Sequence, residues 1–336
     1  MQESVVLGFS GGIDSCTAAR LLMEQGYRVV ALTIDTIGDS AMLDKARQAA
    51  EALGAEWICY DAREEFNKKI IDYFCHAYSS GLTPAPCTRC NTHIKWHILK
   101  HVADKQGIYH IATGHYFQIE KHDTRYYVSR AADSTKDQSY YLWGLSQEIL
   151  ARTLTPMGKI IKSEAKACFE DKSESMGICF LGRCHYATFL AERGVAMTEG
   201  EVVTLDGRVC GRHNGIARYT AGQRRGEGIP EGMRVHDVDA ATNRVRVCEN
   251  SSLYKHTLYI NDFNVVDIDE LLSADDIVVK IRGIGRNPEQ YINVALDSKQ
   301  LVVTLQDAAW APAKGQPLVF YRKNRVIGGG IVVGFK

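Results

Sequence analysis

Residues 8–16, GFSGGIDSC, are the segment that most restricts how this chain can fold. The apolar run SVVLGF leads into the two glycines, and CTAARLLMEQG, with apolar residues at helical spacing, follows them. A strand, a glycine-rich turn and a helix in this order direct backbone N–H groups and the positive end of the helix toward one place, which favours a bound phosphate. The same residues could form an ordinary helix cap, but the preceding apolar strand favours the phosphate site.

The loop contains no lysine, so it does not match the P-loop pattern G-x-x-x-x-G-K-[ST]. Ser10 and Ser15 carry hydroxyl groups that can donate to phosphate oxygens. Asp14 would repel phosphate unless a cation lies between them, and Mg²⁺ is the natural candidate. The loop therefore predicts a phosphate site that differs in chemistry from the P-loop.

Strands and helices alternate through the first half of the chain. The runs SVVLGF, YRVVALTI, EWICYDA and YHIATGHY read as strands, and helices are expected between them, including residues 64–79 and 91–106. This order predicts an α/β fold with a doubly wound parallel sheet. Ligands of such sheets lie at the carboxyl ends of the strands, so the glycine-rich loop, Ile34 and the pair Gly114–His115 should converge on one crevice.

The second half of the chain shows a different pattern of apolar and polar residues. After about residue 190, short alternating runs such as GEVVTLDGRVCGRH, NRVRVCEN and DIVVKIRG are separated by turn residues. This pattern predicts a small β-rich linking module followed by a β-barrel. The predicted domains are residues 1–192, 193–251 and 252–336.

Composition sets limits on partners and location. The 336 residues carry a formal net charge of zero, so composition alone gives no basic footprint for nucleic acid. The first residues lack the pattern of a secretory leader, and no apolar run approaches the roughly 20 residues of a membrane span. A cytoplasmic chain with no membrane partner is expected. In a reducing compartment, clustered cysteines point to metal binding or catalysis rather than to structural disulfides.

Three of the ten cysteines stand out. Cys87 and Cys90 form a C-x-x-C in TPAPCTRCN, expected on a loop that leads into a helix starting near Asn91, where a thiol has a lowered pKa. Cys179 lies in the apolar segment SMGICFLG. Three interpretations are open: a structural zinc site, although no second ligand pair follows; thiol chemistry in which one cysteine carries sulfur and another resolves it; and an iron–sulfur cluster on three thiolates.

Seven motifs together resemble those of the tRNA 2-thiouridylases of the MnmA type, which belong to the PP-loop ATP pyrophosphatases. They occur in the family's order and span almost the whole chain. The motifs are GFSGGIDS, GLTPAPCTRCN, ATGHY, KDQSYYLWGLS, SMGICFLG, RHNGIARYTAGQRRGEGI and GQPLVFYRKNRVIGGGIV.

The resemblance implies an adenine nucleotide alpha hydrolase-like fold and a two-step reaction on the wobble uridine, position 34 of tRNA. ATP, with Mg²⁺, adenylates the C2 oxygen of uracil and pyrophosphate leaves; a persulfide sulfur then attacks C2 and AMP departs. A backbone cradle without lysine suits pyrophosphate held as a leaving group. The implied partners are tRNA and a sulfur-donor or sulfur-relay protein.

The resemblance also assigns roles to individual residues. Cys90 matches the family's nucleophile and Cys179 the cysteine that bears the persulfide. Contacts with tRNA are implied for Lys136, Asp137, Gln138 and Arg282. The implied ATP site comprises Gly8, Phe9, Ser10, Gly11, Gly12, Ile13, Asp14, Ser15, Ile34 and Gly114.

Two departures from the family pattern matter. Cys87 stands where many relatives carry an aspartate, and with Cys90 and Cys179 it makes a three-cysteine set that could hold a [4Fe–4S] cluster instead of acting by persulfide and disulfide. The segments after Ile34 and before Cys179 are shortened, which keeps open an alternative: a PP-loop sulfurtransferase that acts on a different RNA or on a metabolite.

A row of histidines competes with the cysteines as a metal candidate. His93, His97 and His101 recur at i, i+4 and i+8 on the expected helix, a spacing that metal ligands also use. No acidic residue accompanies them, so an exposed helix face is the preferred interpretation.

Overall fold

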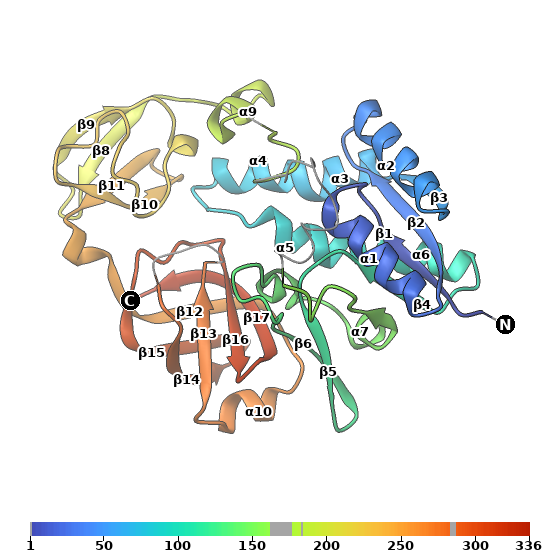
Figure 1. Ribbon diagram of the computed structural model, residues 1–336. Helices are drawn as coiled ribbons and strands as arrows, with labels where there is room; N and C mark the ends of the chain where they lie inside the picture. Colours follow the sequence, from blue (N-terminus) through green and yellow to red (C-terminus); the bar gives the residue numbers. More distant parts are fainter. Residues whose placement is uncertain (1, 162–176, 183, 283–286) are drawn as a thin grey trace. The chain divides into compact units, whose positions relative to one another are not determined.

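The computed structural model describes residues 2–161, 177–182, 184–282 and 287–336. The chain folds into two compact units (Figure 1). Within the described ranges, no helix combines the length and the apolar character that crossing a membrane requires. The first unit comprises residues 1–70, 87–177 and 324–327, and the second comprises residues 71–86, 178–323 and 328–336.

A five-stranded sheet forms the centre of the first unit. Its strand order is β3-β2-β1-β4-β7, and every pairing is parallel, which confirms the predicted α/β fold. The central strand β1 is apolar because both of its faces are covered. The strands are β1 (Ser4–Gly8), β2 (Arg28–Asp35), β3 (Glu56–Asp61), β4 (His110–Thr113) and β7 (Thr153–Leu154).

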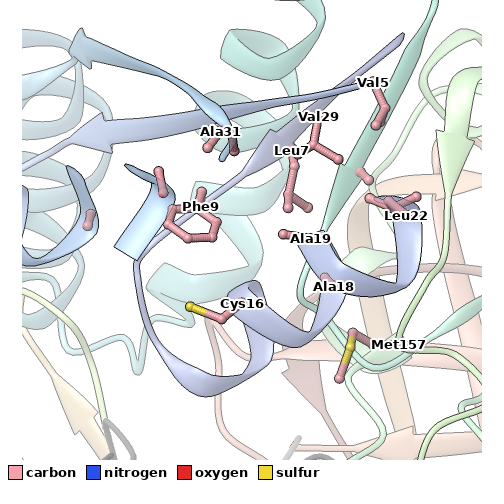
Figure 2. Packing of buried hydrophobic residues seen from close by; sticks show 14 of the residues in the cluster. Val5, Leu7, Phe9, Cys16, Ala18, Ala19, Leu22, Val29, Ala31 and Met157 are labelled. Carbon is pink, nitrogen blue, oxygen red and sulfur yellow. The ribbon is translucent and has the colours of Figure 1, made fainter. Parts of the chain in front are cut away.

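The first helix, α1 (Ile13–Glu24), packs against β1 and β2 (Figure 2). Val5 and Leu7, two positions apart on β1, meet Leu22 of this helix in a buried cluster. Alanines of α2 (Ser40–Ala52) join the same cluster, so both helices cover one face of the sheet. The opposite face meets α6 (Trp96–Lys105): a Cβ on Gly8 would lie 3.6 Å from Leu99. Helices thus lie on both faces of the sheet, as predicted.

The C-x-x-C segment lies in a helix, not on a loop. The helix begins at Pro86, and it runs without a break through α5 (Pro86–Cys90), η2 (Asn91–Lys95) and α6. The expected start near Asn91 is therefore wrong by about one turn. Proline suits the first helical position because its missing N–H would have no partner there. The remaining helical segments of the first unit are α3 (Arg63–Phe66), η1 (Asn67–Ile71, which ends in the second unit), η3 (Ser139–Leu142) and α7 (Gln147–Arg152).

One hairpin of the first unit was not anticipated from the sequence. It consists of β5 (Gln118–His122) and β6 (Arg125–Ser129), turning at Asp123, whose φ is 53°. Ser129 pairs with Arg325, the first residue of β17 (Arg325–Phe335), and residues 324–327 belong to this unit for that reason. Segments nearly 200 residues apart in sequence therefore share one ladder.

In the second unit, α4 (Asp72–Ser79) and α9 (Tyr186–Glu192) share an aromatic cluster. The Phe74 ring packs edge-on against Phe180 and Phe189, with centroids 5.2 and 6.2 Å apart. The ring of Tyr78 stacks on that of Tyr186 at 4.9 Å. This cluster anchors the segment that carries Cys179.

A four-stranded sheet of order β10-β11-β8-β9 forms the linking module. β8 and β11 pair in parallel, whereas the two outer pairings are antiparallel. The sequence interpretation missed β10. The elements are β8 (Gly200–Thr204), β9 (Val209–His213), η4 (Ile216–Arg218), β10 (Arg234–Asp239) and β11 (Arg244–Cys248).

The C-terminal strands form a closed six-stranded barrel, as predicted. Their order is β12-β15-β14-β13-β16-β17, and pairing of β12 with β17 closes the barrel. The three-segment domain boundaries stay a prediction. The elements not yet named are η5 (Asn250–Leu253), β12 (Tyr254–Val265), α10 (Ile268–Ser273), β13 (Ile277–Ile281), β14 (Gln290–Asp297), β15 (Gln300–Trp310) and β16 (Pro317–Arg322).

Candidate active site

The glycine-rich loop links the end of β1 to the start of α1. Gly12 occupies the N-cap position with φ −79° and ψ 170°, and no side chain caps the helix. The Ser15 hydroxyl donates to the Gly12 carbonyl at 3.0 Å, and its oxygen lies 3.4 Å from the Ser10 hydroxyl. The two predicted hydroxyl donors therefore lie together at the positive end of a twelve-residue helix, where an anion is stabilised.

Two glycines of this site leave no room for a side chain. Gly11 has φ 70°, and a Cβ there would lie 2.8 Å from the Ala46 Cα. A Cβ on Gly114, just after β4, would lie 3.0 Å from the backbone nitrogen of Ser15. The backbone of residue 114 therefore packs directly on the first turn of α1, and the structure brings these two predicted ATP-site segments together.

The carboxyl end of β2 lies next to the loop. Phe9 donates its N–H to the Leu32 carbonyl at 2.7 Å, and the Thr33 hydroxyl donates to the Phe9 carbonyl at 2.8 Å. Ile34 follows, partly buried and opposite Tyr60 of β3. The ends of β1, β2 and β4 thus meet at one edge of the sheet, where the sequence predicts the crevice.

Asp14 is connected to a second motif through Tyr116. The Tyr116 hydroxyl donates to Asp14 Oδ1 at 2.9 Å. Gln138 and Tyr116 are joined by two hydrogen bonds: the Tyr116 N–H donates to Gln138 Oε1 at 2.9 Å, and the Gln138 N–H donates to the Tyr116 carbonyl at 2.8 Å. Gln138 belongs to the KDQ motif, residues 136–138. This motif therefore positions Tyr116, which binds the Asp14 carboxylate beside the glycine-rich loop, residues 8–15, called the phosphate loop from here on.

Asp137 organises its own turn. Its Oδ1 accepts from the backbone N–H groups of Ala131 and Ser139 at 3.0 and 3.3 Å, and its Oδ2 accepts from the Ser139 hydroxyl at 2.7 Å. Lys136, beside it, is partly exposed. Sequence reasoning did not anticipate these internal roles, and contacts of this motif with tRNA stay a prediction.

His115 is a neutral imidazole at the edge of the site. Its Nδ1 lies 2.9 Å from the Thr113 hydroxyl, and its ring lies 6.4 Å from that of Trp96. Burial, and to a lesser extent the charge of Lys95, lower the pKa of His115 to about 3. It can therefore donate or accept a hydrogen bond near neutral pH without carrying charge. The sequence placed His115 at the predicted crevice but indicated no role for it.

Cys87 and Cys90 occupy the first turn of the helix that starts at Pro86. Cys87 is exposed, whereas Cys90 is 5% exposed. The Asn91 amide donates to the Tyr141 carbonyl at 3.3 Å. A Cβ on Gly144 would lie 2.4 Å from the Thr92 hydroxyl oxygen, so the segment after the KDQ motif packs closely on this helix. The phosphate loop, the KDQ motif and two of the three cysteines thus belong to one unit.

Cys179 belongs to the second unit. It is exposed between Ile178 and Phe180, both of which pack into the aromatic cluster around Phe74. Gly177 precedes this turn with φ 99°. The turn therefore holds an accessible thiol on a segment anchored by its two neighbours.

Arg282, the predicted tRNA contact of the barrel, follows β13 in the same unit. It has φ 63°, unusual for a residue with a side chain, and its Nη1 donates to the Ala311 carbonyl at 3.2 Å. Its role toward tRNA stays a prediction.

The sequence offered the three cysteines as possible iron–sulfur ligands, whereas the histidine row was preferred as an exposed helix face. Among the described residues, no group of three or more His, Cys, Asp or Glu side chains has the arrangement of a metal site. His93, His97 and His101 are exposed along the helix, as preferred from the sequence.

An open depression of about 810 Å³ lies beyond the end of β3. Its lining comes from residues 60–69 and carries charges of both signs. There, Arg63 Nε donates to Asp61 Oδ1 at 2.9 Å and Arg63 Nη2 donates to Asp61 Oδ2 at 2.6 Å. These hydrogen bonds lower the pKa of Asp61 to about 2. None of the predicted ATP-site residues lines this depression, so we assign the site from the loop geometry.

A parallel sheet whose first strand leads into a glycine-rich, lysine-free loop at the start of a helix defines a nucleotide-binding protein of the PP-loop class. The family model described as "tRNA methyl transferase HUP domain" matches residues 3–183. The models "tRNA methyl transferase PRC-barrel domain" and "Aminomethyltransferase beta-barrel domain" match residues 187–249 and 255–332. The chain belongs to the tRNA-specific 2-thiouridylase family of the MnmA type.

Curated 2-thiouridylases match this chain over nearly its full length. The chain is 40% identical to tRNA-specific 2-thiouridylase MnmA 1 of Bacteroides fragilis, covering 98% of this chain and 97% of that protein. It is 38% identical to MnmA 2 of Phocaeicola vulgatus, covering 98% of both chains. It is 40% identical to MnmA of Amoebophilus asiaticus, covering 99% of this chain and 96% of that protein.

Proposed function

We propose that this chain is an ATP-dependent tRNA 2-thiouridylase that replaces O2 of the wobble uridine, position 34, with sulfur. The observation that carries the proposal is the intact GFSGGIDS loop at the carboxyl ends of the strands, in a chain that matches curated 2-thiouridylases from end to end. No observation favours a metabolite or another RNA as the substrate.

In the first step, the uracil O2 attacks the α-phosphorus of ATP; a P–O bond forms and pyrophosphate leaves with the electrons of the bond that breaks. The loop backbone and the hydroxyls of Ser10 and Ser15 suit the pyrophosphate, and the N-terminus of α1 stabilises its charge. Asp14, the acidic residue of this turn, fits as a single carboxylate ligand for Mg²⁺, which is commonly held by one or two carboxylates and substrate phosphates. The metal would neutralise phosphate charge.

In the second step, sulfur arrives as a persulfide on Cys179. The Cys90 thiolate attacks Sγ of Cys179, a disulfide forms, and the terminal sulfur leaves as hydrosulfide. This sulfur forms a bond to C2, the C2–O bond breaks, and AMP departs with the former O2. The sulfane sulfur gains two electrons, and the two thiols become a disulfide, so the step balances. The exposure of Cys179 supports loading by a sulfur-donor or sulfur-relay protein. We expect the enzyme to work in the cytoplasm, where such thiols are kept reduced.

The alternative route places a [4Fe–4S] cluster on Cys87, Cys90 and Cys179. Three cysteine thiolates with one open iron are a chemically suitable donor set. Protein purified without oxygen separates the routes: iron and visible absorption that are required for thiolation support the cluster, whereas an iron-free protein that thiolates tRNA supports the persulfide.

The RNA must present its base outside the helical stack to reach C2. We propose that Lys136 and Arg282 contact tRNA phosphates, which position the substrate without reading its sequence. Asp137 and Gln138, whose side chains also bond within their own turn, belong to the same proposed tRNA contact.

The test is thiolation of defined tRNA transcripts with ATP and a persulfide source, followed by mass analysis of the nucleosides. We expect 2-thiouridine at position 34 with the unmodified chain and with Cys184→Ser, and none with Cys90→Ser or Cys179→Ser. Cys184 is the matched control because it follows Cys179 by five residues and is partly buried. Sulfur at another position of the tRNA, or no 2-thiouridine with the unmodified chain, would contradict the proposal.

A further inference from the structure

The C-x-x-C pair has the geometry of a disulfide that can open and close. Cys87 and Cys90 are three residues apart within one helical turn, because the helix starts at Pro86. The rise and radius of an α-helix separate such Cα atoms by about 5 Å. Disulfides join Cα atoms roughly 4.4–6.8 Å apart, so the two sulfurs can bond with little movement of the backbone.

The two thiols differ in access. Cys87 is exposed, whereas Cys90 is 5% exposed. Cys87 can therefore meet an external reductant that cannot reach Cys90. The helix that starts beside it continues to Lys105, and its N-terminus stabilises negative charge on a thiolate.

Two buried polar side chains near the pair have an oxygen atom without a hydrogen-bond partner in the described part of the chain. Thr88 follows Cys87, Asn91 follows Cys90, and these two residues are 4% and 3% exposed. Within the described part of the chain, Thr88 Oγ1 and Asn91 Oδ1 lack a hydrogen-bond partner, which is unusual for buried atoms. Burial, and after it the neighbouring Cys87, raise the pKa of Tyr141, so its phenol stays protonated and can donate a hydrogen bond to a thiolate.

We propose that Cys87 is the resolving thiol of this enzyme and closes a disulfide with Cys90 in each turnover. The proposal rests on the proposed function, in which sulfur transfer leaves Cys90 joined to Cys179. The Cys87 thiolate attacks Sγ of Cys90; the Cys87–Cys90 bond forms, the Cys90–Cys179 bond breaks, and Cys179 leaves as a thiolate. The exchange involves no net oxidation or reduction.

This step frees Cys179 to accept the next sulfane sulfur before any reductant acts. An external dithiol then reduces the Cys87–Cys90 disulfide, is itself oxidised to a disulfide, and restores both thiols. An aspartate at position 87 could not take part in this exchange. The cysteine at this position thus gives this chain a means of recycling.

The test uses full-length protein loaded with one persulfide on Cys179 and supplied with tRNA and ATP, without reductant. Trypsin cuts after Lys69, Arg89 and Lys95, so it separates Cys87, in residues 70–89, from Cys90, in residues 90–95. The first peptide also contains Cys75, and fragmentation of the linked peptides distinguishes Cys75 from Cys87. After one turnover and alkylation, we expect these two peptides to be joined by a disulfide. In Cys87→Ser, we expect the 90–95 peptide to be joined to the peptide that carries Cys179.

Kinetics provide a second measurement. With a dithiol reductant present, Cys87→Ser and Cys87→Asp should keep the first-turnover rate but lose about tenfold or more of the steady-state rate, because resolution limits recycling. Cys59→Ser is the control, since Cys59 is an exposed thiol of the same unit outside the site, and it should match the unmodified chain. Thermal unfolding verifies that each variant folds.

The outcomes separate the two proposals. Exclusive Cys90–Cys179 linkage in the unmodified chain, or an unchanged steady-state rate in Cys87→Ser, overturns the resolving role and leaves the proposed function intact. Full steady-state activity in Cys87→Asp but not in Cys87→Ser, with iron in the anaerobic protein, overturns it in favour of a metal ligand. Absence of any 2-thiouridine from the loaded unmodified chain contradicts the proposed function itself.

Discussion

At the scale of single residues, two glycines decide the shape of the phosphate loop. Gly11 combines a left-handed backbone with contact against α2, and Gly114 lets the end of β4 touch the first turn of α1. The sequence placed both residues at the carboxyl ends of strands, and the family resemblance implied their place in the ATP site. It could not predict the contacts, since Ala46 is 35 residues from Gly11.

Gly11→Ala should destabilise the fold and weaken nucleotide binding. The added Cβ would meet the Ala46 Cα while the backbone keeps φ 70°, so we expect a loss of roughly 2–4 kcal/mol in the free energy of unfolding. Gly26→Ala is the control. Gly26 has φ 91°, but a Cβ there meets nothing within 4 Å. We therefore expect the free energy of unfolding to fall by only about 1 kcal/mol. Urea unfolding and ATP titration measure both effects. Equal losses for the two variants would contradict the packing argument.

His115 should make stability depend on pH. Its pKa is lowered from 6.5 to about 3 in the fold, so the unfolded chain binds the proton more tightly. The stabilisation is therefore full above pH 6.5 and is lost as pH falls toward 3. Relative to His115→Gln, the unfolding free energy should rise by roughly 1–3 kcal/mol between pH 4 and pH 7. Parallel pH profiles for the two proteins would show that the imidazole is not held neutral.

At the scale of elements, the helix from Pro86 to Lys105 joins the cysteine pair to the KDQ segment. The apolar spacing of residues 91–106 predicted this helix. Its first turn was not predicted, because the C-x-x-C carries no periodic signal and was assigned to a loop. The proline at the first helical position was the available signal. The hairpin β5–β6 was missed although its own pairing is local; only its pairing with Arg325 depends on tertiary contact.

Gly144→Ala tests the packing between these elements. The new Cβ would lie 2.4 Å from the Thr92 hydroxyl oxygen. We therefore expect the free energy of unfolding to fall by about 1–3 kcal/mol. Thr92→Ala removes the clashing atoms and should restore much of the loss in the double variant. A double-mutant cycle by chemical denaturation measures the coupling, and simple additivity would contradict the assigned contact.

At the scale of the whole molecule, a chain of zero net charge is proposed to bind tRNA through local positive groups. The zero net charge gave no indication of nucleic-acid binding. Only the sequence motifs, through their resemblance to a tRNA-modifying family, indicated tRNA as a partner. The parallel sheet and the closed barrel were predictable because their patterns are local and repeated. The division into compact units was not, since residues 71–86 and 324–327 each join the unit formed mainly by the other half of the sequence.

Lys136→Ala should change how salt affects tRNA binding. If this lysine contacts one phosphate, the slope of log K against log salt should become shallower by about 0.7. Binding isotherms at several salt concentrations measure the slope, with Lys121→Ala, an exposed lysine of β5, as the control. An unchanged slope in Lys136→Ala would remove this residue from the tRNA interface.

The central claim is that the phosphate loop directs the α-phosphorus of ATP to a carbonyl oxygen of the substrate base. The most direct measurement is a thiolation reaction on tRNA that carries ¹⁸O at O2 of the wobble uridine. The account predicts that the label appears in the phosphate of AMP and that pyrophosphate is unlabelled. Unlabelled AMP, or ADP as the product, would contradict it.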